Sequence, residues 1–177
     1  MAVLQTIRNL FVSAEPVEIA AVVPAAPTTY SVRLLTEKDL NNVLRLNARC
    51  FRDGENYTKH TFSYLLNEPG TLSYKAVTAN GEMAGFVFVM VNKNGAAHLT
   101  TIGVAPEHRR RGLAERLLGH LEQALLAKHI ATVMLEVRVS NTSAQSLYRL
   151  TGYTVVQRVT NYYNNGEDGF LMMKSLV

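Results

Sequence analysis

The chain has 177 residues, of which 47% are hydrophobic and 18% charged, and this is the size and composition of one folded domain. A single cysteine, Cys50, excludes an intrachain disulfide and a cysteine-rich zinc site, and it favours a reducing compartment, so we expect a cytoplasmic protein. The 18 basic and 14 acidic residues leave a net charge of +4, which favours an anionic ligand without indicating a nucleic-acid-binding protein.

Residues 1–29 differ in composition from the remainder, because they hold three of the five prolines and only three charged side chains. Apolar residues at helical spacing predict a short amphipathic helix over residues 1–12, followed by an alanine- and proline-rich tether. A signal peptide is disfavoured, because Glu15, Pro16 and Glu18 interrupt the apolar run that it needs. We expect either a disordered or loosely docked arm or a docking helix, in front of a folded domain over residues 30–177. The sequence has no apolar run of about 18 residues that predicts a membrane span.

The first half of this domain predicts a strand, two helices and a hairpin. Residues 30–35 have a strand pattern, and Thr36 with Asp39 forms a capping pattern that opens a helix. A second helix begins near Thr58 and ends before Pro69, which cannot extend it. Two further strands are joined by an Asn-Gly turn, the strongest short hairpin signal, and they span residues 72–78 and 83–91.

The second half alternates strands and helices. A strand over residues 97–104 precedes the longest predicted helix, over 110–128, whose leucines recur at helical spacing. The remaining elements are a strand over 132–139, a helix over 142–150 and two strands that flank a polar loop at 161–168. This alternation predicts a mixed α/β sheet covered by helices, with its parallel part between residues 99 and 139. In such sheets a ligand binds where neighbouring strands diverge.

A basic glycine turn, residues 108–114, follows the strand at 97–104 and leads into the longest helix. Arg109, Arg110 and Arg111 supply positive charge, and Gly112 lets the backbone approach a bulky anion. The start of the helix adds unpaired N–H groups and the positive end of its dipole. Together these features favour a diphosphate, although the turn is neither a Walker loop nor a dinucleotide fingerprint. A solvated basic helix start is the structural alternative.

The stretch IGVAPEHRRRGLA, residues 102–114, resembles the acetyl-CoA signature of the GNAT acyltransferases, in which Arg/Gln-x-x-Gly-x-Gly/Ala follows a strand. Residues 135–153 and 161–173 are similar to the N-terminal acetyltransferases, particularly the ribosomal-protein-alanine type. The resemblance covers residues 30–177. It implies a mixed, largely antiparallel twisted sheet with a splayed parallel central strand pair, flanked by about four helices. It also implies acetyl-CoA as cosubstrate and a protein or peptide N-terminus, such as that of a ribosomal protein, as acceptor.

The resemblance assigns roles to individual residues. Glu136 matches the catalytic base and Tyr148 the catalytic acid. The residues matched to coenzyme binding are Ile102, Gly103, Val104, Arg109, Arg110, Arg111, Gly112, Leu113, Ala114, Glu115 and Asn141. Tyr162 and Tyr163 match the paired tyrosines of the family, and together with Tyr57 they are the residues expected to bind the acceptor. Ala114 replaces the more common second glycine of the signature, and residues 52–57 do not match the family closely, so the acceptor site is the least defined part.

The chemistry of acetyl transfer to nitrogen requires a neutral amine, a polarised thioester carbonyl and a proton for the departing thiolate. Glu136 lies in a strand with apolar neighbours, which would desolvate its carboxylate; the structural alternative is a pair with Arg138 on the same strand face. Tyr148 follows Asn141 by two helical turns, so both can face one cleft. The alternatives are a core aromatic for Tyr148 and a helix cap for Asn141.

A glutamate base suits an α-amine acceptor better than a lysine acceptor. The α-amine has an ordinary pKa near 8, so about 10% of it is neutral at pH 7, whereas only about 0.04% of a lysine side chain is neutral at that pH. Acidic residues of the polar loops, Glu55, Glu167 and Asp168, would attract a basic peptide. Cys50 is not needed as a nucleophile, because the thioester is already activated.

Two competing functions remain open. Within enzymes, the acceptor is a lysine or a small-molecule amine; outside enzymes, the chain is a catalytically silent CoA-binding or sensing domain. The histidines lack a metal-binding spacing, so no metal is expected. We expect no membrane or direct nucleic-acid partner, and a monomer or weak homodimer.

Overall fold

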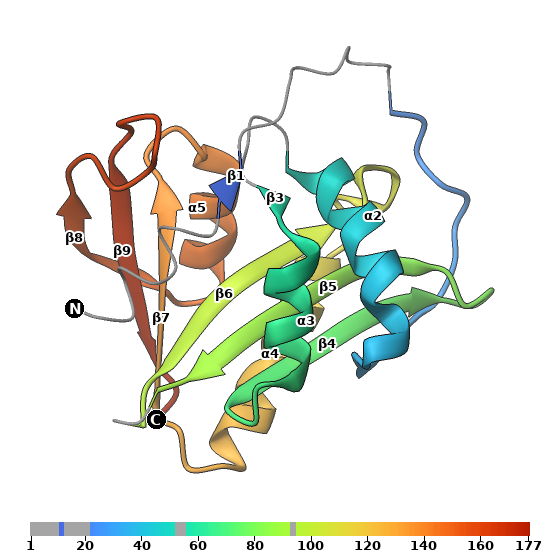
Figure 1. Cartoon of the computed structure of the whole chain (residues 1–177), viewed down its shortest axis with the longest axis horizontal. Coiled ribbons are helices and arrows are strands. Elements are labelled where there is room, and N and C mark those ends of the chain that lie inside the picture. Colours follow the sequence, from blue (N-terminus) through green and yellow to red (C-terminus); the bar gives the residue numbers. More distant parts are fainter. Residues whose placement is uncertain (1–10, 13–21, 52–55, 93–94) are drawn as a thin grey trace.

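The computed structural model describes residues 11–12, 22–51, 56–92 and 95–177 (Figure 1). The helix expected over residues 1–12 therefore lies outside the described residues, except for its last two. These two, Phe11–Val12, form strand β1 instead, because they pair antiparallel with strand β3, Asn56–Tyr57. Hydrogen bonding to a neighbouring strand thus overrides the helical spacing of the sequence at this point.

Seven strands form the main sheet in the order β2-β4-β5-β6-β7-β9-β8 (Figure 1). Every neighbouring pair is antiparallel except β6 and β7, which are parallel. The strands are β2 (Tyr30–Leu34), β4 (Thr71–Thr78), β5 (Met83–Val91), β6 (Ala97–Val104), β7 (Thr132–Arg138), β8 (Thr154–Val159) and β9 (Gly169–Ser175). The largely antiparallel sheet with a parallel central pair, expected from the sequence, is confirmed.

Four α-helices of the described chain cover the sheet. They are α2 (Leu40–Cys50), α3 (Lys59–Asn67), α4 (Leu113–Leu126) and α5 (Thr142–Leu150). Successive side chains of β5 point to opposite faces of the sheet and so contribute to two separate cores. Phe86 and Phe88 pack under α2 and α3, whereas Val87 and Val89 pack with the leucines of α4. Among the described residues, every helix is too short or too polar to traverse a lipid bilayer.

The central parallel pair separates early. Strands β6 and β7 pair only at Ala97 with Val133 and at His98 with Met134. A register shift in the pairing of β5 with β6 leaves Thr100 as the extra residue of a β-bulge just after this point, and bulges bend a strand. The two strands therefore diverge toward their carboxyl ends and leave an opening in the middle of the sheet.

Candidate functional site

A cleft of about 930 Å³ occupies this opening between β6 and β7. Its walls are the carboxyl half of β6, the basic glycine turn, the start of α4, strand β7, helix α5 and the loop before β9. Every residue that the sequence assigned to the site lines this cleft, except Arg111 and Tyr162. The fold therefore brings together segments from residue 57 to residue 163.

One end of the cleft is formed by the basic glycine turn. Gly112 has a φ of 70° and Arg110 a φ of 60°, so two residues of the turn are left-handed. The predicted helix over 110–128 consequently begins only at Leu113, since left-handed residues cannot belong to it. No atom lies within 4 Å of the position that a Cβ on Gly112 would occupy, so the backbone here faces open space. The first N–H groups of α4 have no partner within the helix, and they form, with the turn, an anion-binding concavity.

The wall beside this turn is the splayed part of β6. A Cβ on Gly103 would lie 2.8 Å from the Phe86 ring and 3.2 Å from the Cys50 sulfur, so only glycine fits there. The Nε of Arg109 donates to the Val104 carbonyl at 3.2 Å, which ties the turn back to the end of the strand. The strand can thus present its backbone to a ligand along the cleft, because beyond His98 it makes no ladder with β7.

The opposite end of the cleft contains Glu136 of β7. Its Oε2 lies 2.6 Å from Nε2 of His98, and both side chains are at most 5% exposed. Arg138, the partner considered from the sequence, bonds Glu167 at 2.7 Å instead and stacks over the Tyr163 ring. His98 was not predicted from the sequence, because it lies in a different strand; its local signal is a histidine within a largely buried strand.

Tyr148, in helix α5, lines the same cleft as Glu136. It is buried, and burial raises the pKa of its phenol above the ordinary value, so the hydroxyl stays protonated and can donate. Asn141 caps α5, because its side chain accepts the Ala144 N–H at 3.0 Å. The helix cap considered for Asn141 is confirmed, and the residue also lines the cleft.

The three tyrosines matched to acceptor binding take different positions. The Tyr57 hydroxyl donates to the Thr100 carbonyl at 3.1 Å, and burial together with the Glu136 charge raises the pKa of this phenol. Tyr163 lines the cleft, whereas Tyr162 lies beside it, with its ring centroid 5.0 Å from that of Tyr163. Atoms of Tyr162 lie within 3.3 Å of the position that a Cβ on Gly169 would occupy. The Tyr162 ring therefore fills the space that is free because Gly169 has no side chain.

The acidic residues expected to attract a peptide are already engaged where the structure describes them. Glu167 accepts hydrogen bonds from the Ser140 N–H and from Arg138, which lower its pKa to about 2. Asp168 pairs with Arg158 at 2.8 Å. Glu55 lies outside the described residues.

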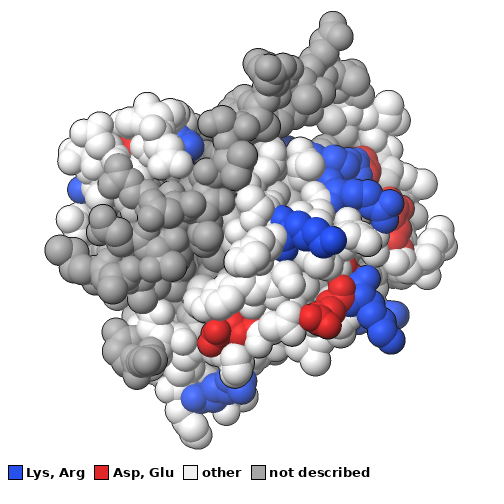
Figure 2. Space-filling model, in the orientation of Figure 1, with Lys and Arg blue, Asp and Glu red and all other residues white. Residues whose placement is uncertain are grey.

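Arg111 is the second predicted site residue outside the cleft. Its guanidinium donates to the carbonyl oxygens of Ala25 and Ala26, in the segment that precedes β2. The positive charge that the cleft itself receives from the turn therefore comes from Arg109 and Arg110. On the face shown in Figure 2, basic side chains gather over α2 in the upper right, with acidic side chains beside them.

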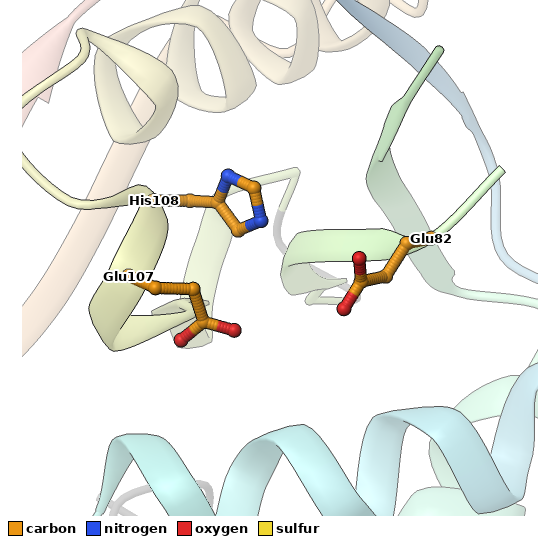
Figure 3. A group of neighbouring side chains, drawn as sticks. All are labelled: Glu82, Glu107 and His108. Carbon is orange, nitrogen blue, oxygen red and sulfur yellow. The ribbon is translucent and has the colours of Figure 1, made fainter. Parts of the chain in front are cut away.

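Two other reactive groups lie near the cleft. Burial raises the pKa of the Cys50 thiol to about 11, and its sulfur is 3.3 Å from the Val104 carbonyl, to which it donates. Glu82, Glu107 and His108 point toward one another, with possible ligand atoms within 4.8 Å (Figure 3). Arg49 neutralises Glu107 at 2.5 Å, so we assign no metal to this cluster.

Comparisons with known proteins agree with this geometry. The sequence model of the acetyltransferase (GNAT) family matches residues 40–153. A putative ribosomal-protein-alanine N-acetyltransferase of Bacillus subtilis is 32% identical over 146 residues, covering 82% of this chain and 95% of its own. An N-alpha-acetyltransferase of Caenorhabditis elegans is 31% identical over 153 residues, which cover 82% of this chain and 82% of that protein. The crystal structure of the ribosomal-protein-alanine N-acetyltransferase of Escherichia coli superposes with a TM-score of 0.76 at 31% identity, over 84% of this chain and 94% of that one.

Proposed function

The chain belongs to the acetyltransferase (GNAT) family, and from this premise we propose that it transfers an acetyl group from acetyl-CoA to a protein N-terminal α-amine. The observation that carries the proposal is the convergence on one cleft of the glycine turn with Glu136 and Tyr148, which come from separate segments. Similar chains of two kinds, a ribosomal-protein-alanine and an N-alpha-acetyltransferase, support the α-amine as acceptor.

The coenzyme fits the end of the cleft that the glycine turn forms. The open space at Gly112, the free N–H groups of α4 and the side chains of Arg109 and Arg110 suit a pyrophosphate. The splayed backbone from Ile102 to Val104 suits the pantetheine arm and the thioester carbonyl, and Asn141 faces them from α5. Acetyl-CoA supplies an acetyl group that is already activated as a thioester.

Glu136 acts as the base in this proposal. Its carboxylate accepts the proton that the amine nitrogen loses as it bonds to the acetyl carbon. The contact from His98 holds one oxygen, so the carboxylate is fixed in orientation, while Oε1 has no hydrogen-bond partner among the described residues. An oxygen that is buried and unpaired in this way is suited to receive a proton, directly or through a water molecule.

Tyr148 acts as the acid. When the C–S bond breaks, the thiolate sulfur takes the phenolic proton, so that the products are the amide and the free thiol. Because the acetyl group passes directly to nitrogen, no covalent enzyme intermediate forms. The protonated thiol of Cys50 agrees with this, since a thiol of raised pKa is a poor nucleophile.

Tyr57 and Tyr163 line the same cleft as Glu136 and Tyr148, and we assign them to the acceptor peptide. Their hydroxyls can bond a peptide backbone, and Tyr162 supports Tyr163 through their edge-to-face contact. We further propose that a ribosomal protein is among the acceptors, and that the protein is a cytoplasmic monomer or weak homodimer. Its organisation would be an N-terminal arm over residues 1–29 and a catalytic domain over 30–177.

A panel of acceptors with mass detection tests the proposal. One peptide carries a free N-terminal alanine and an internal lysine, a matched peptide has the α-amine blocked, and spermidine represents small amines. We expect one acetyl group on the first peptide, located at its α-amine by fragmentation, and none on the blocked peptide. Acetylation of lysine or spermidine alone would assign the other acceptor class. Binding of acetyl-CoA with no product would indicate a silent coenzyme-binding domain.

A further inference from the structure

The described segment before β2, residues 22–29, runs along one edge of the molecule, and we call it the strap (Figure 1). The Ala25 N–H donates to the Glu107 carbonyl at 3.0 Å. At its other end the Thr28 hydroxyl accepts the Ala79 N–H at 3.3 Å, from the turn between β4 and β5. The strap precedes residues 40–153, which the family model matches.

Arg111 makes the densest contacts between the strap and the glycine turn. Its Nη1 donates to the Ala26 carbonyl and to the Tyr30 hydroxyl, each at 3.1 Å, and its Nη2 donates to the Ala25 carbonyl. Of the three successive arginines, Arg111 is the one whose residue does not line the cleft. Its charge is therefore used to hold two backbone carbonyls of the strap.

Tyr30, the first residue of β2, extends this attachment to both sides of the turn. Its hydroxyl lies 2.9 Å from Nδ1 of His108, and the two rings meet edge to face. Its carbonyl accepts a hydrogen bond from Arg116 of α4 at 2.9 Å. His108 is buried on the short 3-10 turn that also carries Glu107 (Figure 3). The segment before the turn and the helix after it are thus fixed to the same strand start.

The glycine turn has a conformation that needs such support. Arg110 is left-handed although it has a side chain, and Gly112 is left-handed two residues later, so Arg111 lies between two unusual backbone conformations. Strained backbone of this kind persists only where surrounding contacts determine it. The contacts that reach Arg111 itself come from the strap and from Tyr30.

We propose that the strap holds the glycine turn in its coenzyme-binding conformation, with Arg111 as a positioning residue that does not touch the coenzyme. This rests on the proposed function, which places the pyrophosphate on the turn. If the strap favours the binding conformation, coenzyme binding must stabilise the docked strap in return, because such coupling is reciprocal. The sequence predicts that Arg111 binds the coenzyme directly, and this proposal gives it an indirect role instead.

Calorimetric titration with CoA tests this in the full chain. We expect Arg111→Ala to raise the Kd about fivefold, a typical size for coupling between sites. Ala25→Pro removes the N–H that bonds Glu107 but keeps every arginine, and it should weaken binding in the same direction. Arg45→Ala is the control, because Arg45 bonds only Asn42 of its own helix among the contacts described, and its Kd should equal that of the wild type.

The pattern across these variants decides the matter. If Arg111→Ala binds CoA more weakly while Ala25→Pro binds it with the Kd of the wild type, Arg111 contacts the coenzyme directly. This result would overturn the proposal. Unchanged binding in both variants would overturn it as well. Failure of the wild type to bind CoA would instead refute the proposed function. In kinetics, the KM for acetyl-CoA should rise while kcat and the KM for the peptide stay constant, a split that general destabilisation would not give.

Hydrogen exchange of the wild-type protein provides a test that needs no variant. Amide exchange in residues 22–30 should slow when CoA is added, and exchange in β8, which is far along the sheet, should not change. Equal exchange of the strap with and without saturating CoA would contradict the coupling.

Discussion

The proposed coenzyme end of the cleft is built mainly of backbone, from residues 102–104 and 109–114 with the side chains of Arg109 and Arg110, whereas the proposed acceptor end consists of side chains from separate elements. Tyr57 comes from β3, Glu136 from β7, Tyr148 from α5 and Tyr163 from the loop before β9. A site made of backbone depends on φ and ψ angles, and a site made of side chains depends on chemical identity. The two ends should therefore respond to different kinds of substitution.

The largest expected effect is at the acceptor end. Glu136→Gln keeps the shape of the side chain but cannot accept a proton, so we expect kcat to fall about 10²-fold or more. Tyr148→Phe should lower kcat as well, because it removes the donor for the thiolate. In both variants the Kd for CoA, measured by calorimetry, should stay constant.

Glu122→Gln is the matched control for the glutamate variant, because Glu122 pairs with Lys174 and does not line the cleft. Its kcat should equal that of the wild type. Full activity in both Glu136→Gln and Tyr148→Phe would show that the catalytic assignment is wrong.

A backbone change should have the next largest effect, now at the coenzyme end. Gly112→Val forces a β-branched residue to a φ of 70°, which costs about 1–2 kcal/mol, so the affinity for CoA should fall about tenfold. Gly119→Val, in helix α4 with no atom within 4 Å of its Cβ position, is the control and should bind as the wild type does. Equal Kd values for the two variants, measured by calorimetry, would contradict a backbone-defined site.

A smaller effect is expected from Glu167, whose pKa of about 2 is held down by hydrogen bonds from Ser140 and Arg138. A carboxylate whose pKa is lower in the folded than in the unfolded chain stabilises the fold above its unfolded pKa, and this contribution is lost as the pH falls. Glu167→Gln should therefore lower the urea midpoint at neutral pH, and the difference from the wild type should shrink between pH 4.5 and about pH 2. A difference that stays constant over this range would contradict the assignment.

The smallest effect is predicted for Cys50→Ala. The thiol lines the cleft but has its pKa raised to about 11, and direct transfer does not use it. We expect turnover within about twofold of the wild type, as for a substitution that touches no catalytic group. An acetyl group found on Cys50 by intact-mass measurement after incubation with acetyl-CoA would show that transfer is not direct.

The same difference between the two ends explains what the sequence could predict. The glycine turn is a local pattern, so residues 102–114 indicated the coenzyme end, and the strand and helix order indicated the sheet. His98 and Glu136 are far apart in sequence, and only the parallel register of β6 and β7 brings them together. The ring of Tyr162 turns into the protein because Gly169 leaves room for it, which no local pattern signals.

The difference between the predicted and the observed start of α4 has a related cause. The leucine periodicity of α4 extended the predicted helix back to residue 110, but periodicity carries no information about the left-handed Arg110 and Gly112. The contacts of Arg111 depend on the strap, which is held by hydrogen bonds to its backbone and to the Thr28 hydroxyl, and its sequence does not signal them.

The most direct test of the central claim, that the glycine turn and the splayed strands form an acetyl-CoA site, is a calorimetric titration of the purified full chain with acetyl-CoA. We expect saturable binding of one molecule per chain, with a Kd within the usual range for enzyme substrates, about 1 μM to 1 mM. Absence of any heat of binding at millimolar acetyl-CoA would contradict it.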